Sequence, residues 1–291
     1  MLREPRQALV PSAFSVQAAE KWALHRSRKL PDRLLRLTDF WYINFVRQPA
    51  PGERKTRYTM KIAQSENYGS AVGLSPALPA PALEQVGKDV RHILRARLYR
   101  DTIEQIAFVD LIMGHVSRTA DKQIVLDGGM RAKYVARSQI FADEAERILQ
   151  HKCSRKFNRH RRGILVIGAT AAILSALLKR GFHVTSTDLR PEIVGNEFGG
   201  VRVLNGKAAN AELMKEADLA IITGMALVNR TLPSLIALAK THNTSTMMWA
   251  VTGRNFGHYY TQNGVDSVIS DPSPFLLLPG RAVMEIWRRS K

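Results

Sequence analysis

Glycine and polar residues follow several apolar runs in the second half of the chain, where a ligand-binding site would be expected. One run ends in Gly168, Ala169 and Thr170, and the next ends at Asp188, 20 residues after Gly168. Ligands of open parallel sheets bind beyond the carboxyl ends of the strands, and an acid at the end of the second strand binds the ribose hydroxyls of an adenosine. Gly168 and Asp188 therefore predict an adenosine-bearing ligand. The alternative is that Gly168 serves only helix–sheet packing and Asp188 only caps a turn.

The turn after the first of these runs discriminates among adenosine-bearing cofactors. Its sequence, GATAAI, holds one glycine rather than the G-x-G-x-x-G that lets a pyrophosphate approach a helix N-terminus. NAD and FAD are therefore disfavoured, and the chain has no G-x-x-x-x-G-K-S/T loop for nucleoside triphosphates. S-adenosylmethionine has no phosphates and fits this turn better. We expect it to contact Gly168, Ala169, Thr170, Asp188, Leu189, Thr223, Gly224 and Met225.

Polar residues after further expected strands are candidates for substrate binding. Arg254 has the planar donor geometry that clamps a carboxylate, and Asn229 could hydrogen-bond an adenine edge or a substrate carboxylate. The alternative role of Asn229 is to cap the following helix. Asn255 lies beside Arg254, and Asp271 follows the last expected strand. These residues predict a small-molecule substrate that is anionic or amino-acid-like.

Two neighbouring residues are candidates for proton transfer. His258 and Tyr259 follow the same strand end as Arg254 and are candidate acids or bases. A lone histidine is more often structural than catalytic. Alkyl transfer can be accelerated largely by orientation, so the expected reaction does not require a strong acid–base pair.

Residue spacing predicts neither a metal site nor a hydrolase. None of the eight histidines forms H-x-x-x-H or H-E-x-x-H, and the single cysteine, Cys153, cannot form an internal disulfide or a Cys-rich zinc site. A G-x-S-x-G nucleophile elbow is also missing from the sequence. We expect no metal ligands from the chain itself, and whether a metal binds is left open.

The candidate residues follow predicted strands, which alternate along the chain with predicted helices. In the second half, strands are expected at 163–169, 182–188, 201–205, 218–224, 245–253 and 266–270, with helices between them and a last helix at 280–289. This alternation predicts a Rossmann-like, doubly wound parallel sheet. Arg190, just beyond the second strand, is expected to face solvent.

The first half predicts a smaller α+β domain. Residues 38–48 and 57–65 are expected to be strands of a hairpin, and residues 69–83, which hold glycine and proline throughout, a loop. Helices are expected at 82–100, 103–117 and 138–150, the last with Ser138 as its cap. The expected class is α/β. Its parts are a basic, partly helical extension over residues 1–37, an α+β domain over 38–155 and a Rossmann-like ligand-binding domain over 163–291.

The chain carries a formal net charge of +18, most of it in the first part. Residues 1–162 hold 30 Lys and Arg against 16 Asp and Glu. Such a field favours anionic partners of any kind. Aromatic stacking motifs and a helix-turn-helix are missing from the sequence, so nucleic-acid binding is disfavoured. The basic run at 152–162 is expected to be a solvated helix end and linker, or else to line an anion-binding cleft.

Targeting signals are also missing from the sequence. The first 14 residues hold no apolar core of a signal peptide, and no run approaches the roughly 18 apolar residues that a membrane span needs. With a single cysteine, these features predict a cytoplasmic protein without membrane contact. A homodimer is one assembly that the sequence leaves open.

The second half, from about Gly163 to Pro279, resembles the Rossmann-like domain of the putative heavy-metal chelation family. The resemblance rests on ADLAIITGMALVNRTL at 217–232, on the strand ending in Gly253, and on NGVDSVISDP at 263–272. It implies a first domain like the N-terminal domain of enolase and a ligand in the cleft between the two domains. It also suggests a link to a metal-chelating small molecule, such as its biosynthesis.

Taken together, these features lead to one expected function and two alternatives. We expect a small-molecule enzyme that uses S-adenosylmethionine for alkyl transfer or related chemistry in specialised metabolism, for example metallophore biosynthesis. The first alternative is a non-catalytic protein that binds a heavy metal or a metal chelate. The second is a basic nucleic-acid binder, which steeply salt-dependent affinity would reveal.

Overall fold

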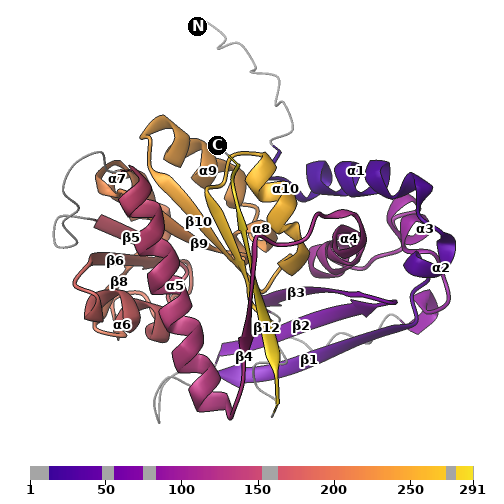
Figure 1. Cartoon of the computed structure of the whole chain (residues 1–291), viewed down its shortest axis with the longest axis horizontal. Helices are drawn as coiled ribbons and strands as arrows, with labels where there is room; N and C mark the ends of the chain where they lie inside the picture. Colours follow the sequence, from indigo (N-terminus) through magenta and orange to yellow (C-terminus); the bar gives the residue numbers. More distant parts are fainter. Residues whose placement is uncertain (1–12, 48–55, 75–82, 153–162, 273–279, 291) are drawn as a thin grey trace, which may run out of the picture.

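In the part of the chain that the computed structural model describes (residues 13–47, 56–74, 83–152, 163–272 and 280–290), the strands form two sheets, one of three strands and one of nine. Each sheet organises one unit of the molecule (Figure 1). The α/β class expected from the sequence is confirmed. Most of the basic run, residues 153–162, lies outside the described residues, so neither of its two interpretations is tested.

The smaller sheet is an antiparallel meander in the order β1-β2-β3. Its strands span β1 (Asp39–Arg47), β2 (Thr56–Gln64) and β3 (Tyr68–Leu74). Alternate side chains point to opposite faces of a strand. Phe40, Ala63 and Ala71 therefore join the core beneath helix α4 (Thr102–Val116), whereas Met60 and Ile62 pack on the other face.

Most of strand β3 was expected to be a loop, and that expectation is wrong for residues 69–74. The reason is the role of its glycines. A Cβ atom on Gly69 would lie 2.1 Å from the backbone N of Leu111 and 2.2 Å from the carbonyl O of Ala107. Gly69 therefore lets α4 approach the strand closely, which is a known use of glycine inside a strand.

The N-terminal helices complete the core of this first unit rather than extending away from it. Ser15 caps α1 (Val16–Arg26) by accepting a 3.1 Å hydrogen bond from the N–H of Ala18. Ala19 and Ala23 of α1 are fully buried in the same core as α4. Two short helices, α2 (Asp32–Leu35) and α3 (Val90–Arg95), pack around them.

The larger sheet has the strand order β4-β12-β11-β10-β9-β5-β6-β8-β7. The six strands from β8 to β11 in this order are parallel, as predicted, and β12, β4 and β7 run antiparallel at the edges. The bounds are β4 (Lys122–Leu126), β5 (Gly163–Ile167), β6 (His183–Asp188), β7 (Glu197–Phe198), β8 (Val201–Asn205), β9 (Leu219–Thr223), β10 (Ser245–Ala250), β11 (Ser267–Ser270) and β12 (Ala282–Arg288).

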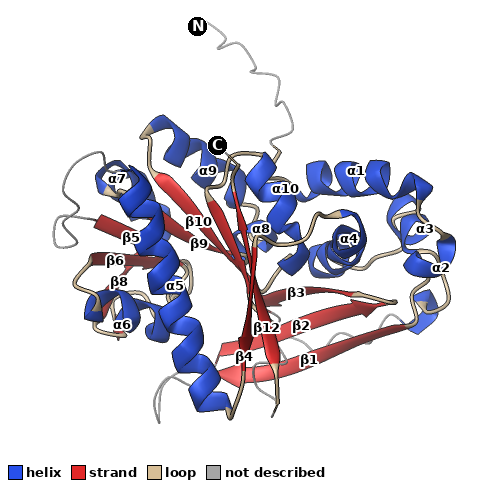
Figure 2. Ribbon diagram, in the orientation of Figure 1, coloured by secondary structure: helices blue, strands red, loops and turns tan. Residues whose placement is uncertain are grey.

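Helices cover both faces of this sheet (Figure 2). One face packs against α5 (Met130–Lys152) and α6 (Ala171–Lys179). The other face packs against α7 (Gly206–Glu216), α9 (Leu232–Thr241) and α10 (Gly257–Gln262), and its core is continuous with that of the first unit. This two-sided cover accounts for the nearly unbroken apolar runs of the parallel strands.

The last element was expected to be a helix at 280–289 and is instead strand β12. Its side chains alternate between buried and more exposed positions at Ala282, Val283, Met284 and Glu285, which is the period of a strand. The antiparallel partners β11 and β4 satisfy its backbone on both sides. Over so short a run, the spacing of the apolar residues fits a helix as well as a strand. Pairing with neighbouring strands decides which of the two forms.

The expected domain boundary near residue 155 also has to be corrected. Strand β4 pairs with β12, and α5 packs on the large sheet, so residues 122–152 belong to the second unit. The junction in sequence therefore lies between α4 and β4. Helix α5 begins at Met130, and Ser138 lies inside it, where its hydroxyl donates to the carbonyl of Tyr134 over 2.8 Å rather than capping the helix.

The two units meet where β3 runs beside the chain that leaves β10. The N–H of Val72 donates to the hydroxyl of Thr252 over 2.9 Å, and the N–H of Gly253 donates to the carbonyl of Ser70 over 3.0 Å. The Ser70 hydroxyl donates to the carbonyl of Val251 over 3.1 Å. The small sheet therefore covers a carboxyl end of the large sheet, where ligands of this sheet type bind.

Candidate functional site

The strand order places Gly168 at a topological switch point. Strand β5 lies between β6 and β9, so the chain turns to opposite sides of the sheet after β5 and before β9. Gly168 has a φ of 97°, and a Cβ atom there would lie 2.5 Å from Cγ2 of Thr223. Gly168 thus permits the close approach of the two strand ends. This is packing between strand ends, and the helix–sheet packing that the sequence left open as its alternative stays untested.

Asp188 ends β6 as predicted, but its carboxylate is already bound within the chain. One oxygen accepts from the N–H of Ala169 over 2.9 Å and from Nη2 of Arg190 over 2.6 Å. The other accepts from the N–H and from Nε of Arg190, each over 2.9 Å. Burial opposes ionisation, but the hydrogen bonds and charge of Arg190 outweigh it and lower the pKa of Asp188. A ribose would have to displace Arg190.

Arg190 was expected to face solvent, and that expectation is wrong. Its side chain is only 11% exposed and donates through Nη1 to the hydroxyl of Tyr58, on strand β2 of the smaller sheet. The guanidinium also lies 5.9 Å from the centre of the Tyr58 ring. Arg190 therefore links the second strand of the large sheet to the small sheet that covers it.

The other expected cofactor contacts lie around the same strand ends without forming a polar cradle. Gly224 is buried, and a Cβ atom there would lie 2.5 Å from the carbonyl O of Thr252. Met225 packs with the apolar face of the small sheet, Leu189 is 38% exposed, and Thr170 precedes α6 without a side-chain capping bond. Their role toward S-adenosylmethionine stays a prediction.

Asn255 belongs to a buried clamp around Asp110, a residue of α4. Asp110 accepts from the N–H of Ser70 over 2.8 Å and from the N–H of Asn255 over 2.7 Å. The Asn255 amide donates to the carbonyls of Tyr68 and Asp110 over 2.9 and 3.0 Å. Burial raises the pKa of Asp110 well above its ordinary value. The expected substrate contact of Asn255 is thus taken up by bonds that join α4 and β3 to the end of β10.

Arg254 is buried and poorly paired. Its guanidinium lies 4.4 Å from the centre of the Tyr68 ring, and its Nη2 lies 3.5 Å from a carboxylate oxygen of Glu285. Among the described residues, its Nε has no hydrogen-bond partner. Burial lowers the pKa of Arg254 and outweighs the opposing charges of Glu285 and Asp271. A buried guanidinium with so few acceptors is able to bind an added anion.

Asp271, whose charge acts on Arg254, pairs with a second buried arginine. The Asp271 carboxylate is fully buried and accepts from Nη1 of Arg137 over 2.9 Å and from the Trp249 indole N–H over 3.1 Å. Arg137, on α5, also stacks over the rings of Tyr134 and Trp249, at 4.5 and 5.4 Å from their centres. Its Nε has no partner either.

We refer to these residues as the arginine cluster: Arg137, Trp249, Arg254, Asp271 and Glu285. The cluster lies where β10 and β11 end, on the edge of the sheet that this fold uses for ligands. The hydroxyl of Ser270, the last residue of β11, is also buried and has no hydrogen-bond partner in the part of the chain that the structure describes. Unsatisfied buried donors are uncommon in proteins and call for an explanation. An anion bound among them would satisfy these donors.

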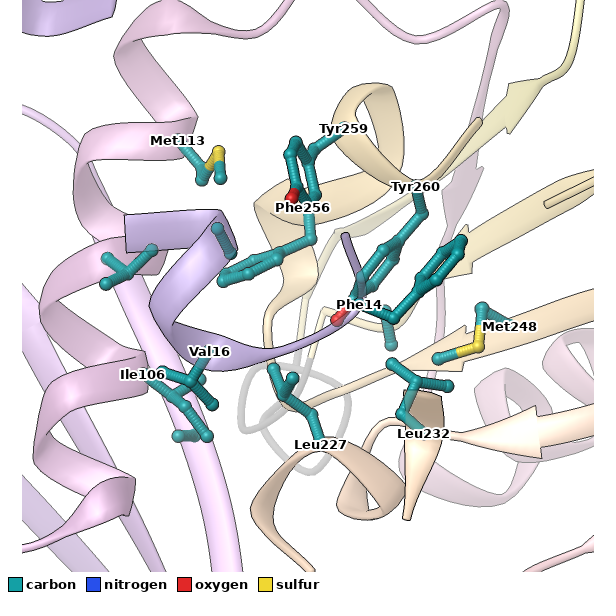
Figure 3. Packing of buried hydrophobic residues seen from close by; sticks show 14 of the residues in the cluster. Phe14, Val16, Ile106, Met113, Leu227, Leu232, Met248, Phe256, Tyr259 and Tyr260 are labelled. Carbon is teal, nitrogen blue, oxygen red and sulfur yellow. The ribbon is translucent and has the colours of Figure 1, made fainter. Parts of the chain in front are cut away.

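The candidate proton-transfer residues lie apart from the arginine cluster and serve packing. The hydroxyl of Tyr259 donates to the carbonyl of Ala13, and burial raises its pKa to about 12. Figure 3 shows its ring within the apolar core near Phe256 and Met113. Burial, followed by the charges of Arg118 and Arg26, lowers the pKa of His258, which packs edge-on against Trp22. Their expected role in proton transfer stays a prediction.

Within the described residues, Asn229 neither caps the helix that follows it nor has a side-chain hydrogen bond to the arginine cluster. It is exposed and ends the short helix α8 (Met225–Val228), where its N–H donates to the carbonyl of Met225 over 2.9 Å. The following helix α9 begins after Thr231 instead. Its expected contact with a substrate therefore stays a prediction.

Sequence reasoning found two members of the cluster, Arg254 and Asp271, and missed three. Arg137 lies on the buried side of α5 together with Lys133, which is fully buried. Two basic residues four positions apart on the apolar face of a helix were a detectable signal. Trp249 and Glu285 gave no signal, because their places beside Asp271 and Arg254 depend on strands β10 and β12 lying in one sheet.

The part of the chain that the structure describes holds no group of three or more His, Cys, Asp or Glu side chains placed to bind a metal ion. It also contains no helix long and apolar enough to cross a membrane.

Comparison with known families gives one match. Residues 157–250 match the family model described as "Putative heavy-metal chelation". The resemblance to this family is confirmed. The match covers the switch point and the strand end before the arginine cluster, and it does not reach the smaller sheet. For the first unit, the likeness to enolase stays a prediction.

Two solved structures of members of this family are similar to the chain at low sequence identity. A protein of unknown function from Desulfitobacterium hafniense is 13% identical with a TM-score of 0.50, and the alignment covers 92% of this chain and 98% of that one. A second, from Pyrococcus horikoshii, is 10% identical with a TM-score of 0.49, covering 95% and 99%. At this identity, the likeness to the Desulfitobacterium structure supports the fold of this chain and nothing about its function. No curated protein matches the chain.

Proposed function

We propose that the chain binds a small, carboxylate-bearing ligand at the arginine cluster, with Arg254 as the principal carboxylate-binding group. The observation that carries the proposal is the state of Arg254. It is 9% exposed, its Nε is unpaired, and its carboxylate contact is 3.5 Å long. A buried charge normally has close partners, because leaving it without them is costly. A ligand carboxylate would supply the missing acceptor.

The surrounding residues suit an oriented, multidentate anion. Asp271 fixes Arg137 through Nη1, so that the remaining donors of this guanidinium have a set direction. The rings of Tyr134 and Trp249 hold the same guanidinium by stacking. Arg137 pairs with Asp271 and Arg254 lies near Glu285, so two guanidiniums from different elements are available, which favours a ligand with more than one carboxylate.

The family description gives this ligand class a context. Carboxylates are the groups with which small-molecule chelators bind divalent and heavier metal ions, and heavy-metal chelation is the property named for the family. Guanidinium groups bind the carboxylates of such a molecule and not the cation. The proposed ligand is therefore a polycarboxylate chelator, taken up free or with its metal.

S-adenosylmethionine remains a second candidate, as cofactor of an enzyme that would modify such a ligand. The observation in its favour is the position of Asp188, ionised at the end of the strand next to the switch point. Binding there would require Arg190 to leave the carboxylate of Asp188. The two candidates therefore depend on different residues and can be separated.

The test is calorimetric titration of the purified, metal-stripped protein with nitrilotriacetate, with its nickel complex and with S-adenosylmethionine. The variant Arg254→Gln removes the charge and keeps a polar side chain of similar reach. We expect it to weaken chelator binding about tenfold to hundredfold, as the loss of one charged hydrogen-bonding partner does. Arg180→Gln, at an exposed ion pair with Asp143, is the control and should bind normally.

Each result decides between the candidates. Chelator binding that Arg254→Gln weakens and Arg180→Gln leaves intact supports the proposal. Chelator binding that survives in Arg254→Gln, or no binding of either carboxylate probe, contradicts it. S-adenosylmethionine binding that is lost in Asp188→Asn but kept in Arg254→Gln would support the second candidate instead.

A further inference from the structure

A cavity of about 460 Å³ lies at the amino ends of the parallel strands of the large sheet, whereas the arginine cluster lies at their carboxyl ends. It opens where β10 and β11 begin, between the last turns of α5 and α9 and the end of β12. Its wall includes Ser245 and Thr246, the first residues of β10, whereas the arginine cluster lies at the other end of that strand. The volume is in the range of sites for small organic ligands.

The wall of this cavity is strongly basic. It includes five side chains that are always cationic at neutral pH and a single acid, Asp266. The basic residues are Arg147, Lys152, Lys240, Arg288 and Arg289. They come from three different elements, so the charge is gathered by the fold and is not one solvated helix face. Below them lie the apolar side chains of Ile148 and Ile236.

One buried carboxylate fixes two of these arginines. Glu144 accepts from Nε and Nη2 of Arg147 over 3.0 and 2.7 Å, and from Nε and Nη2 of Arg288 over 3.1 and 2.7 Å. The Ser267 hydroxyl also donates to it over 2.7 Å. Within the described residues, these bonds leave Nη1 of each arginine without a hydrogen bond. The two guanidiniums are therefore held in place with donors to spare.

The lysines of the cavity are not neutralised. Lys152 donates to the carbonyl of Asn243, and Lys240 to the carbonyl of Asn263 over 3.5 Å, so both contacts leave the charge uncompensated. Arg289, in contrast, pairs with Asp266 over 2.6 Å. With one carboxylate shared between two arginines, the cavity keeps an excess of positive charge that an anion would offset.

We propose that this basic cavity binds a small organic phosphate of nucleotide size. Planar guanidiniums with free N–H donors and mobile ammonium groups are the combination that proteins use for phosphates. The phosphates would lie among Arg147, Arg288 and Lys152, and the organic part would extend over Ile236. This site is separate from the arginine cluster and does not depend on the function proposed there.

The test uses adenosine triphosphate, inorganic tripolyphosphate and adenosine as probes, titrated into the full chain. We expect the triphosphate nucleotide to bind most tightly, tripolyphosphate more weakly because it lacks the organic part, and adenosine not measurably. Lys152→Glu should weaken nucleotide binding at least tenfold. Lys179→Glu is the matched control, because Lys179 is also the last residue of an exposed helix end but lies outside the cavity wall.

Further readouts separate this site from nonspecific attraction. Arg254 lies at the carboxyl ends of the strands, far from this cavity along β10, so Arg254→Gln should leave nucleotide binding unchanged. Equal weakening in Lys152→Glu and Lys179→Glu would show that only the net charge attracts the nucleotide, and would overturn the proposal. Tighter binding of a double-stranded oligonucleotide that Lys152→Glu does not weaken would also overturn it, in favour of a nucleic-acid surface elsewhere.

Discussion

At the scale of single residues, Asp188 offers a direct measure of what its buried pair with Arg190 contributes. Asp188→Asn leaves the Arg190 guanidinium buried without its carboxylate. Removing one partner of a buried pair costs about 3–5 kcal/mol of unfolding free energy. Urea unfolding at pH 7 should show a loss of this size. Asp143→Asn, whose partner Arg180 is paired on the surface, should cost under about 1 kcal/mol.

The same pair predicts how stability depends on acid. The folded state lowers the pKa of Asp188 below its unfolded value of about 3.8, so below that pH the unfolded chain binds more protons. The contribution of Asp188 is therefore complete above about pH 4 and is lost as the pH falls through the folded pKa. The difference between the wild type and Asp188→Asn should shrink along this acid limb. A difference that stays constant down to pH 2 would contradict the assignment.

Part of the candidate site could be predicted from the sequence, and the reason is physical. Arg254 and Asp271 could be found because they follow strands whose ends meet at one edge of a parallel sheet. What the sequence could not show is which partners would already occupy these groups. Arg190 is two residues from Asp188, and its return to that carboxylate depends on Tyr58 from the other sheet lying above it.

At the scale of elements, close packing of α4 on β3 depends on a glycine. Gly69→Ala would place a methyl group 2.1 Å from the backbone of Leu111, so the helix would have to move away from the sheet. Overpacking of this kind costs about 1–3 kcal/mol. Thermal unfolding should show the loss. At Gly129 an added Cβ meets nothing within 4 Å, and Gly129→Ala should be neutral or slightly stabilising. Equal effects at the two positions would refute this account of β3.

The elements that sequence patterns predicted well are those whose pattern is decided locally. The strands from β5 to β11 that pair in parallel are apolar runs closed by glycine or a polar residue, and α4 has its capping acid, Asp101, directly before it. Strands β3, β4 and β12 were missed because their identity depends on partners far away in sequence. Residues 282–288 become a strand because β11 and β4 lie on either side.

At the scale of the whole molecule, the largest apolar core cluster is shared by the two units, and we expect them to unfold together. The largest apolar cluster includes Ala19 and Ala23 from α1, Phe108 from α4, and Ile222 and Met248 from the large sheet. The Asp110 clamp adds hydrogen bonds from α4 to β3 and to Asn255 beyond β10. Separating the units would expose this apolar surface to water, which costs about 25 cal/mol of free energy per Å². It would also leave the buried Asp110 without its hydrogen-bond partners. The second unit keeps a separate core between its sheet and helices α5 and α6, so the prediction of joint unfolding rests on the shared cluster and the Asp110 clamp.

This shared core can be tested with the tryptophans of the chain. Trp41 reports on the small sheet and Trp249 on the large one. We expect variants that keep only one of these tryptophans, with the others changed to Phe, to show urea transitions with the same midpoint, as two-state unfolding requires. Asp110→Ala should lower both midpoints together. A Trp41 transition that comes first, while Trp249 still reports a folded sheet, would show instead that the small sheet can detach. Because β3 covers the strand ends that hold Arg254, such detachment would also open the arginine cluster to solvent.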